Sequence, residues 1–193
     1  MAIELELKFR ADATALAAIE AAFPEKAHRL QMETVYYDTP DAALSKQHYT
    51  LRKRQENDVH ICTLKTPAGS QGRNEWETEC NHIEDAIPIL CKLSGSEELL
   101  TLTRSGIISI CGAKFTRIAK ALTIPGAVVE LALDQGVLLG GSKELPFWEA
   151  EIELKSGSPK ALMAFGQDFA KKFGLQTEPK SKFRRALDLT KGD

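Results

Sequence analysis

The sequence predicts an antiparallel α+β protein or a β-barrel, and three observations favour this class. Most segments between turn residues alternate apolar and charged side chains as strands do, beginning with residues 2–10. Helical segments are few and stand between runs of strands, which argues against a βαβ series. The 193 residues suffice for a sizeable core, and we expect a single domain over residues 1–193.

The first half of the chain is predicted to be rich in strands. We expect strands at residues 2–10, 28–38, 49–56, 59–66 and 73–80. Asp12 can cap a helix through the alanine-rich stretch that follows, and Pro24 stops it. Thr39-Pro40-Asp41 opens a turn and one short helix, and Asn57-Asp58 is the expected turn of a hairpin.

The second half is predicted to begin and end with helices. Residues 83–104 are expected to be mostly helical, with breaks at Pro88 and at Ser94-Gly95-Ser96. Strands should follow at about 113–123, 127–134, 136–140 and 147–155. The last expected helix starts at Ser158-Pro159, a favourable N-cap and first residue, and Gly174 ends it.

Composition excludes several classes of protein. The net charge is −2, with 25 basic and 27 acidic residues, which argues against a nucleic-acid partner but permits a small anionic ligand. Charge begins at Glu4, so we expect no signal peptide, no membrane partner and a cytoplasmic location. The four cysteines form no Cys-x-x-Cys pair and are expected to be reduced thiols, and the scattered histidines favour neither a zinc site nor a Ser-His-Asp triad.

Charged residues share one face of several expected strands, because alternate side chains point to opposite sides. Glu4, Glu6 and Lys8 do so in the first strand, and the pattern recurs at Glu149, Glu151, Glu153 and Lys155, at Arg73, Glu75, Glu77 and Glu79, at Thr50, Arg52 and Arg54, and at Glu130 and Asp134. Any one of these strands alone is typical of a sheet with one solvated face. Successive glutamates about 7 Å apart on one face repel, however, and need a counterion.

A barrel could gather these faces into one lumen. Paired carboxylates are hard oxygen ligands that suit Mg²⁺ or Mn²⁺. Arginine and lysine suit phosphate oxygens, arginine through its bidentate fork. The combination predicts a site for a metal-bound polyphosphate.

The motif Glu4-x-Glu6-x-Lys8 resembles the N-terminal signature of the CYTH family, the triphosphate tunnel metalloenzymes. Seven further stretches resemble motifs of that family in the same order: Val35-Tyr36-Tyr37-Asp38-Thr39-Pro40, Leu51-Arg52-Lys53-Arg54, Thr63-Leu64-Lys65-Thr66, Asn74-Glu75-Trp76-Glu77, Val129-Glu130-Leu131-Ala132-Leu133-Asp134, Glu149-Ala150-Glu151-Ile152-Glu153 and Ser181-Lys182-Phe183-Arg184-Arg185. Arg117 occupies the position of a later family arginine. The chain is most similar to the bacterial inorganic triphosphatases of this family.

The resemblance implies a closed eight-stranded antiparallel β-barrel with covering helices, whose polar lumen holds a triphosphate and Mg²⁺ or Mn²⁺. It implies metal ligands at Glu4, Glu6, Glu130, Asp134, Glu149, Glu151 and Glu153. Phosphate ligands are implied at Lys8, Arg52, Arg54, Lys65, Arg117 and Lys182. Catalysis is assigned to Glu4, Glu6, Lys8, Glu75 and Glu77. An alternative for Glu75, Glu77, Glu130, Asp134 and Glu149 is that they hold the basic residues in place or orient water.

The implied activity is metal-dependent hydrolysis of inorganic triphosphate, a small-molecule substrate, to pyrophosphate and orthophosphate. The alternatives are hydrolysis of thiamine triphosphate or a nucleoside triphosphate, or cyclisation of ATP as in the small adenylate cyclases. A non-catalytic polyphosphate-binding module is a further alternative. So many carboxylates speak against it, because an anion binder gains nothing from them without metal.

Overall fold

The computed structural model describes residues 5–68 and 72–191. Its strands are β1 (Glu6–Arg10), β2 (Ala27–Asp38), β3 (Thr50–Glu56), β4 (Val59–Ala68), β5 (Gly72–Glu79), β6 (Ile108–Ile124), β7 (Ala127–Gly140), β8 (Lys143–Gly157) and β9 (Gln176–Thr177). Its helices are α1 (Ala13–Ala22), α2 (Ala43–Lys46), α3 (Ile83–Ser94), α4 (Glu98–Leu102), α5 (Pro159–Phe173) and α6 (Lys182–Leu189), with a 3₁₀ turn at Thr103–Ser105.

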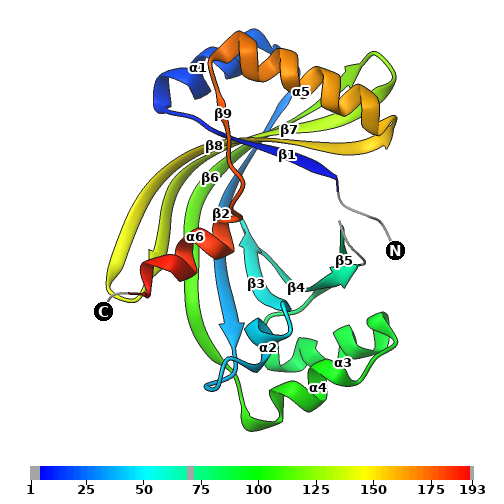
Figure 1. Cartoon of the computed structure of the whole chain (residues 1–193), viewed down its shortest axis with the longest axis vertical. Helices are drawn as coiled ribbons and strands as arrows, with labels where there is room; N and C mark the ends of the chain where they lie inside the picture. The colour runs from blue at the N-terminus through cyan, green and yellow to red at the C-terminus, as the bar shows by residue number, and fades with distance from the viewer. Residues whose placement is uncertain (1–4, 69–71, 192–193) are drawn as a thin grey trace.

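All strands in the described part of the chain belong to one antiparallel sheet of nine, in the order β5-β4-β3-β2-β6-β7-β8-β1-β9. The predicted closed eight-stranded barrel is therefore wrong. Closure needs the two edge strands to pair with each other. Here β5 and β9 are the edges, and the short β9 occupies part of the outer edge of β1, opposite Phe9 and Arg10. Strands with one charged and one apolar face fit an open, strongly curved sheet as well as they fit a closed barrel, and Figure 1 shows the open sheet.

The helices covering the outer face of the sheet form two separate layers (Figure 1). α1 and α5 cover the end built by β1 and β6–β8, where Ile19, Ile152 and Phe169 are buried in one apolar cluster. α3 and α4 cover β3–β5 through a second cluster that includes Leu64 and Leu90. None of the helices in the described part of the chain is long and apolar enough to cross a membrane.

Local sequence signals account for most element boundaries. The Asp12 carboxylate accepts a hydrogen bond from the backbone N–H of Ala15 at 2.7 Å and starts α1. Gly174, with φ of 64°, ends α5 in the left-handed conformation that favours glycine. Pro88 lies inside α3 without ending it, which corrects the predicted break there. The break at Gly95 is confirmed, because this residue caps α3 with φ of 69°.

Two strands predicted at 127–134 and 136–140 are one continuous strand, β7. Gly136 lies within it because β6 approaches too closely for a side chain: a Cβ at this position would overlap the backbone oxygen of Lys114. The glycine is therefore a contact point between strands and not a break. β6 and β8 also extend beyond their predicted ends.

Helix α6, which was not predicted from the sequence, lies within the arch of β6, β7 and β8 on the concave face of the sheet (Figure 1). The Ser181 hydroxyl caps it by accepting from the backbone N–H of Arg184 at 3.1 Å. Its apolar side packs on the sheet: Ala186 is fully buried, and the Phe183 ring lies 4.9 Å from that of Tyr36, centroid to centroid, with the planes tilted by 42°. This helix brings the C-terminal basic residues onto the face that carries the charged rows.

Candidate functional site

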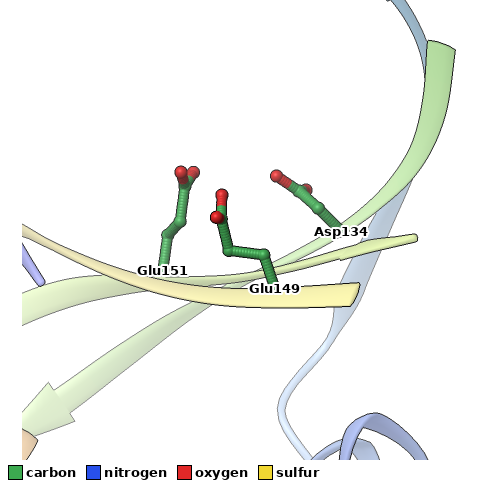
Figure 2. Close-up of side chains that lie close together, drawn as sticks. All are labelled: Asp134, Glu149 and Glu151. Atoms are coloured by element: carbon green, nitrogen blue, oxygen red, sulfur yellow. The ribbon is translucent and has the colours of Figure 1, made fainter. Parts of the chain in front are cut away.

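Three carboxylates form the most buried acidic group on the concave face, which we call the inner acidic cluster: Asp134 on β7, and Glu149 and Glu151 on β8. Asp134 lies directly opposite Glu149 in the ladder, and one oxygen of each carboxylate lies within 4.8 Å of the others. Figure 2 shows the three side chains rising from the same face of the sheet. Such a group is close enough to share a metal ion.

Three cations already contact the inner acidic cluster. Lys182 Nζ lies 2.8 Å from Asp134 Oδ2 and 2.8 Å from Glu151 Oε1, and it also contacts Glu149 Oε1. Arg117 donates to both oxygens of Asp134, at 2.8 and 2.7 Å, and to Glu151 at 2.5 Å. Arg185 contacts Glu149 Oε2. Each carboxylate of the cluster therefore has at least one cation in contact with it.

The protonation equilibria of this cluster follow from burial and from these pairs. Burial alone would lower the pKa of Lys182 and Arg117, but the surrounding carboxylates raise both values above normal. Burial opposes ionisation of Glu151, yet the charges of Lys182 and Arg117 hold its pKa well below the usual range. At Glu149 burial dominates and raises the pKa to about 7.

A second group, the outer acidic row, crosses three neighbouring strands at Glu6, Glu153 and Glu130. Glu6 on β1 and Glu130 on β7 both lie opposite Glu153 on β8. Their side chains are 27, 31 and 34% exposed, whereas Asp134 and Glu149 are fully buried. Lys8 pairs with Glu6 at 3.1 Å, and Lys155 pairs with Glu153 at 2.8 Å.

The two acidic groups differ as potential metal sites. In the outer acidic row, the three carboxylates pair with Lys8 and Lys155 among the described residues, and all three are partly exposed to solvent. This arrangement fits a divalent cation, which binds carboxylate oxygens that are accessible from water. The inner acidic cluster offers the same oxygens, but a cation entering it would have to displace a buried ammonium or guanidinium group. Glu4, the other predicted ligand of the first strand, lies outside the described residues.

Three guanidinium groups, Arg52 and Arg54 of β3 and Arg117 of β6, form a basic group on the same face. Burial lowers the pKa of Arg54, and the positive charges of Arg52 and then Arg117 lower it further, against the charges of Glu56 and Glu77. The Nε atom of Arg54 is buried and has no hydrogen-bond partner among the residues that the structure describes. An anion bound between these side chains would offset the repulsion among the guanidinium groups and could accept a hydrogen bond from Arg54 Nε.

Carboxylates of β5 lie next to the basic group. Glu75 Oε2 is 3.1 Å from Lys65 Nζ, and Glu75 Oε1 is 3.5 Å from Arg52. Glu77 accepts a hydrogen bond from the Thr63 hydroxyl at 2.9 Å. Burial would raise the pKa of Glu77, but the Thr63 bond and the charge of Arg54 outweigh it and lower the value. Glu77 therefore stays ionised beside the basic group.

The structure brings the predicted residues that it describes onto one face of the sheet, on β1 and on β3 through β8, with Lys182 added from α6. A second ion-pair network was not predicted from the sequence: Glu178 joins Arg10 at 2.5 Å and Arg185 at 3.7 Å. The sequence held one indication of this network, because Ser181 is a favourable N-cap and predicts a helix that contains Arg185.

Asp38 has a structural role. Its carboxylate is buried and accepts hydrogen bonds from the backbone N–H groups of Thr39, Leu44 and Ser45.

Comparison with known proteins gives a consistent result. A sequence model of the CYTH domain matches residues 2–187. The inorganic triphosphatase of Haemophilus influenzae is 34% identical over 140 residues, which are 70% of this chain and 39% of that protein. The chain therefore spans about two fifths of the length of this curated relative.

Solved structures share the fold at lower identity. A putative adenylate cyclase from Bacillus halodurans superimposes with a TM-score of 0.68 at 17% identity, covering 95% of this chain and 96% of that one. HpAC1 from Hippeastrum, a putative adenylyl cyclase described as having a dominant triphosphatase activity, gives 0.67 at 19% identity, with 97% and 96% covered. At these identities the likeness concerns the fold alone.

Proposed function

The chain belongs to the CYTH family, and from that premise we propose that it hydrolyses inorganic triphosphate to pyrophosphate and orthophosphate with a divalent cation. The observation that carries the proposal is the basic group. Arg54 lies beside the guanidinium groups of Arg52 and Arg117, and its Nη2 pairs with Glu56 at 2.5 Å. Its buried Nε has no hydrogen-bond partner among the described residues. The mutual repulsion of the three guanidinium groups and the free donor at Arg54 Nε favour the binding of an anion among them. The name of the Haemophilus influenzae relative supports inorganic triphosphate as that anion.

The phosphate chain would lie along the basic residues of the concave face. We assign contacts with its oxygens to Arg52, Arg54, Lys65 and Arg117, together with Lys8 and Lys182. These side chains come from β1, β3, β4, β6 and α6, so each phosphate can meet a cation from a different element. Charge-assisted contacts of this kind hold the chain extended and stabilise the charge that develops on the leaving pyrophosphate.

Glu6, Glu130 and Glu153 are the residues that would hold a divalent cation, and Glu4 is the further predicted ligand. Mg²⁺ or Mn²⁺ suits this all-carboxylate set, and when bound it neutralises phosphate oxygens and polarises the phosphorus under attack. Asp134 and Glu149 are better explained as counterions of Lys182, Arg117 and Arg185. This follows the alternative in which these carboxylates hold basic residues in place.

Glu77 is the best placed carboxylate to orient the attacking water. It stays ionised, is fixed by Thr63, and is 40% exposed, so its second oxygen can accept a hydrogen bond from water. In-line attack on a terminal phosphorus then needs only positioning and charge stabilisation, with no covalent intermediate on the protein.

The site offers little to recognise a nucleoside. Among the described strands, Tyr36 lies opposite Arg52 on the face of the charged rows, but it is 5% exposed and packs against Phe183 of α6. Phe115 and Phe147 share that face, and both are almost fully buried. Lys182 Nζ lies over both rings, at 5.4 and 5.6 Å from their centroids. A base cannot stack on rings that are covered in this way. We therefore propose inorganic triphosphate over ATP as the preferred substrate.

A phosphate-release screen tests this proposal. Inorganic triphosphate, ATP, pyrophosphate and thiamine triphosphate are compared with Mg²⁺ and with Mn²⁺, and nucleotide products are separated by chromatography. We expect kcat/KM for inorganic triphosphate to exceed that for ATP by about tenfold or more, because ATP has one terminal charge fewer and forgoes one charge-assisted hydrogen bond. Equal efficiency on ATP, or cyclic AMP among the products, would overturn the assignment and favour the cyclase alternative.

A further inference from the structure

We infer that Arg185 is a positioning residue, which acts through Glu149 to keep Lys182 available to the phosphate chain. The inference rests on the proposed function, since it assumes that Lys182 contacts the substrate. It concerns a residue on the helix α6 whose ion pairs are with Glu149 and Glu178, outside both the basic group and the outer acidic row. It is based on the way in which Lys182 and Arg185 share the carboxylate of Glu149.

Glu149 is fully buried and divides its two oxygens between two cations of α6. Oε1 contacts Lys182 Nζ and Oε2 contacts Arg185 Nη2. Lys182 and Arg185 lie three positions apart and therefore on the same side of the helix, facing β8. Because one carboxylate serves both, the charge of Arg185 determines how strongly Glu149 attracts Lys182.

Arg185 is itself held from several sides. Its guanidinium carbon lies 5.5 Å from the centroid of the Phe147 ring, and Nη1 lies 3.7 Å from Glu178 Oε2. Glu178 in turn accepts from Arg10 Nε at 2.5 Å. The side chain of Arg185 is 13% exposed, whereas that of its neighbour Arg184 is 55% exposed and pairs only weakly, at 3.3 Å from Asp188. The fixed guanidinium group is thus a permanent neighbour of Glu149.

Charge balance gives the consequence for binding. With Arg185 present, Glu149 Oε2 is engaged by Arg185, and Lys182 contacts Oε1. Without it, Lys182 is, among the described residues, the cation that remains in contact with Glu149, and the carboxylate charge that Arg185 offsets falls on Lys182 alone. That charge would hold Lys182 more tightly and repel an approaching phosphate, because electrostatic interactions are strong where water is excluded. Loss of Arg185 should therefore weaken substrate binding more than it slows the chemical step.

The test compares Arg185→Gln and Arg185→Lys with the matched control Arg184→Gln in the same helix. We expect Arg185→Gln to raise KM for inorganic triphosphate at least about tenfold, as for the removal of one charge-assisted hydrogen bond, with a smaller change in kcat. Arg185→Lys restores the charge and should return KM to within about threefold of the unaltered chain. Arg184→Gln should leave both constants unchanged.

A double-substitution cycle with Lys182→Gln separates positioning from mere structural support. If Arg185 acts through Lys182, Arg185→Gln should raise KM less than about twofold once Lys182 is replaced. An equal effect in both backgrounds would overturn the inference. Should the double variant not fold, as judged by circular dichroism, the lysine variant decides: a KM as high as that of Arg185→Gln overturns it. If the unaltered chain shows no turnover of triphosphate, the proposed function fails, and this inference fails with it.

Discussion

Replacing Asp134 by asparagine should destabilise the fold, because this carboxylate is a counterion in the interior. Asp134 is fully buried and receives two hydrogen bonds from Arg117, at 2.8 and 2.7 Å. It also lies 2.8 Å from Lys182 Nζ. Asparagine keeps the shape and one acceptor oxygen but removes the negative charge. Two buried cations would then share the remaining carboxylates, Glu149 and Glu151.

The magnitude follows from the cost of leaving a buried ion pair without one partner, about 3–5 kcal/mol in the free energy of unfolding. A domain of this length loses about 2–4 °C in Tm for each kcal/mol, so Tm should fall by about 6–20 °C. Asparagine retains one acceptor, which favours the lower part of this range. A metal ligand would behave in the opposite way, since its removal relieves repulsion among carboxylates in the absence of metal.

The assay is thermal unfolding followed by circular dichroism, in EDTA and in Mn²⁺, with Glu153→Gln as the matched control. Glu153 is about one-third exposed and pairs with an exposed lysine, so its removal should change Tm in EDTA by less than about 2 °C. The same variant should raise the Mn²⁺ concentration for half-maximal activity at least about tenfold. The reasoning is refuted if Asp134→Asn leaves Tm unchanged in EDTA but abolishes the stabilisation by Mn²⁺.

Three further predictions concern the cation, the basic group and acid stability. Chelation by EDTA should abolish phosphate release and leave the far-ultraviolet circular dichroism unchanged, because the sheet is held by its own hydrogen bonds; loss of the β signal would contradict this. Arg54→Gln should raise KM for inorganic triphosphate by about 10–100-fold in steady-state assays and leave Tm equal or higher, since it relieves repulsion from Arg52 and Arg117; an unchanged KM would remove Arg54 from the site. Burial raises the pKa of Glu178, but the bond from Arg10 outweighs this and the value is lowered from 4.5, so its stabilisation is present above about pH 4.5 and lost as pH falls through the lowered value. Tm measured between pH 3 and 6 should therefore fall more steeply in the unaltered chain than in Glu178→Gln, and parallel curves would contradict this assignment.

The sequence by itself determined which side chains share a face. Alternation in residues 147–155 placed Glu149, Glu151 and Glu153 together, and the structure has them on the concave face of β8 opposite the buried Ile152. It also located helix ends, since Asp12 and Gly174 act where they were predicted. These features are local: a strand has a period of two, and a cap needs only its nearest neighbours.

The tertiary structure alone decided how the strands close and which charges meet. The eight-stranded barrel was an inference from resemblance, and the described strands form an open sheet of nine. The sequence could not show that Lys182 would reach Asp134, 48 positions away, and neutralise carboxylates predicted to bind metal. Strand edges and ion pairs join residues far apart in the chain, and their partners depend on how whole elements pack. Periodicity fixes the face on which a charge lies, whereas only packing fixes the charge that it meets.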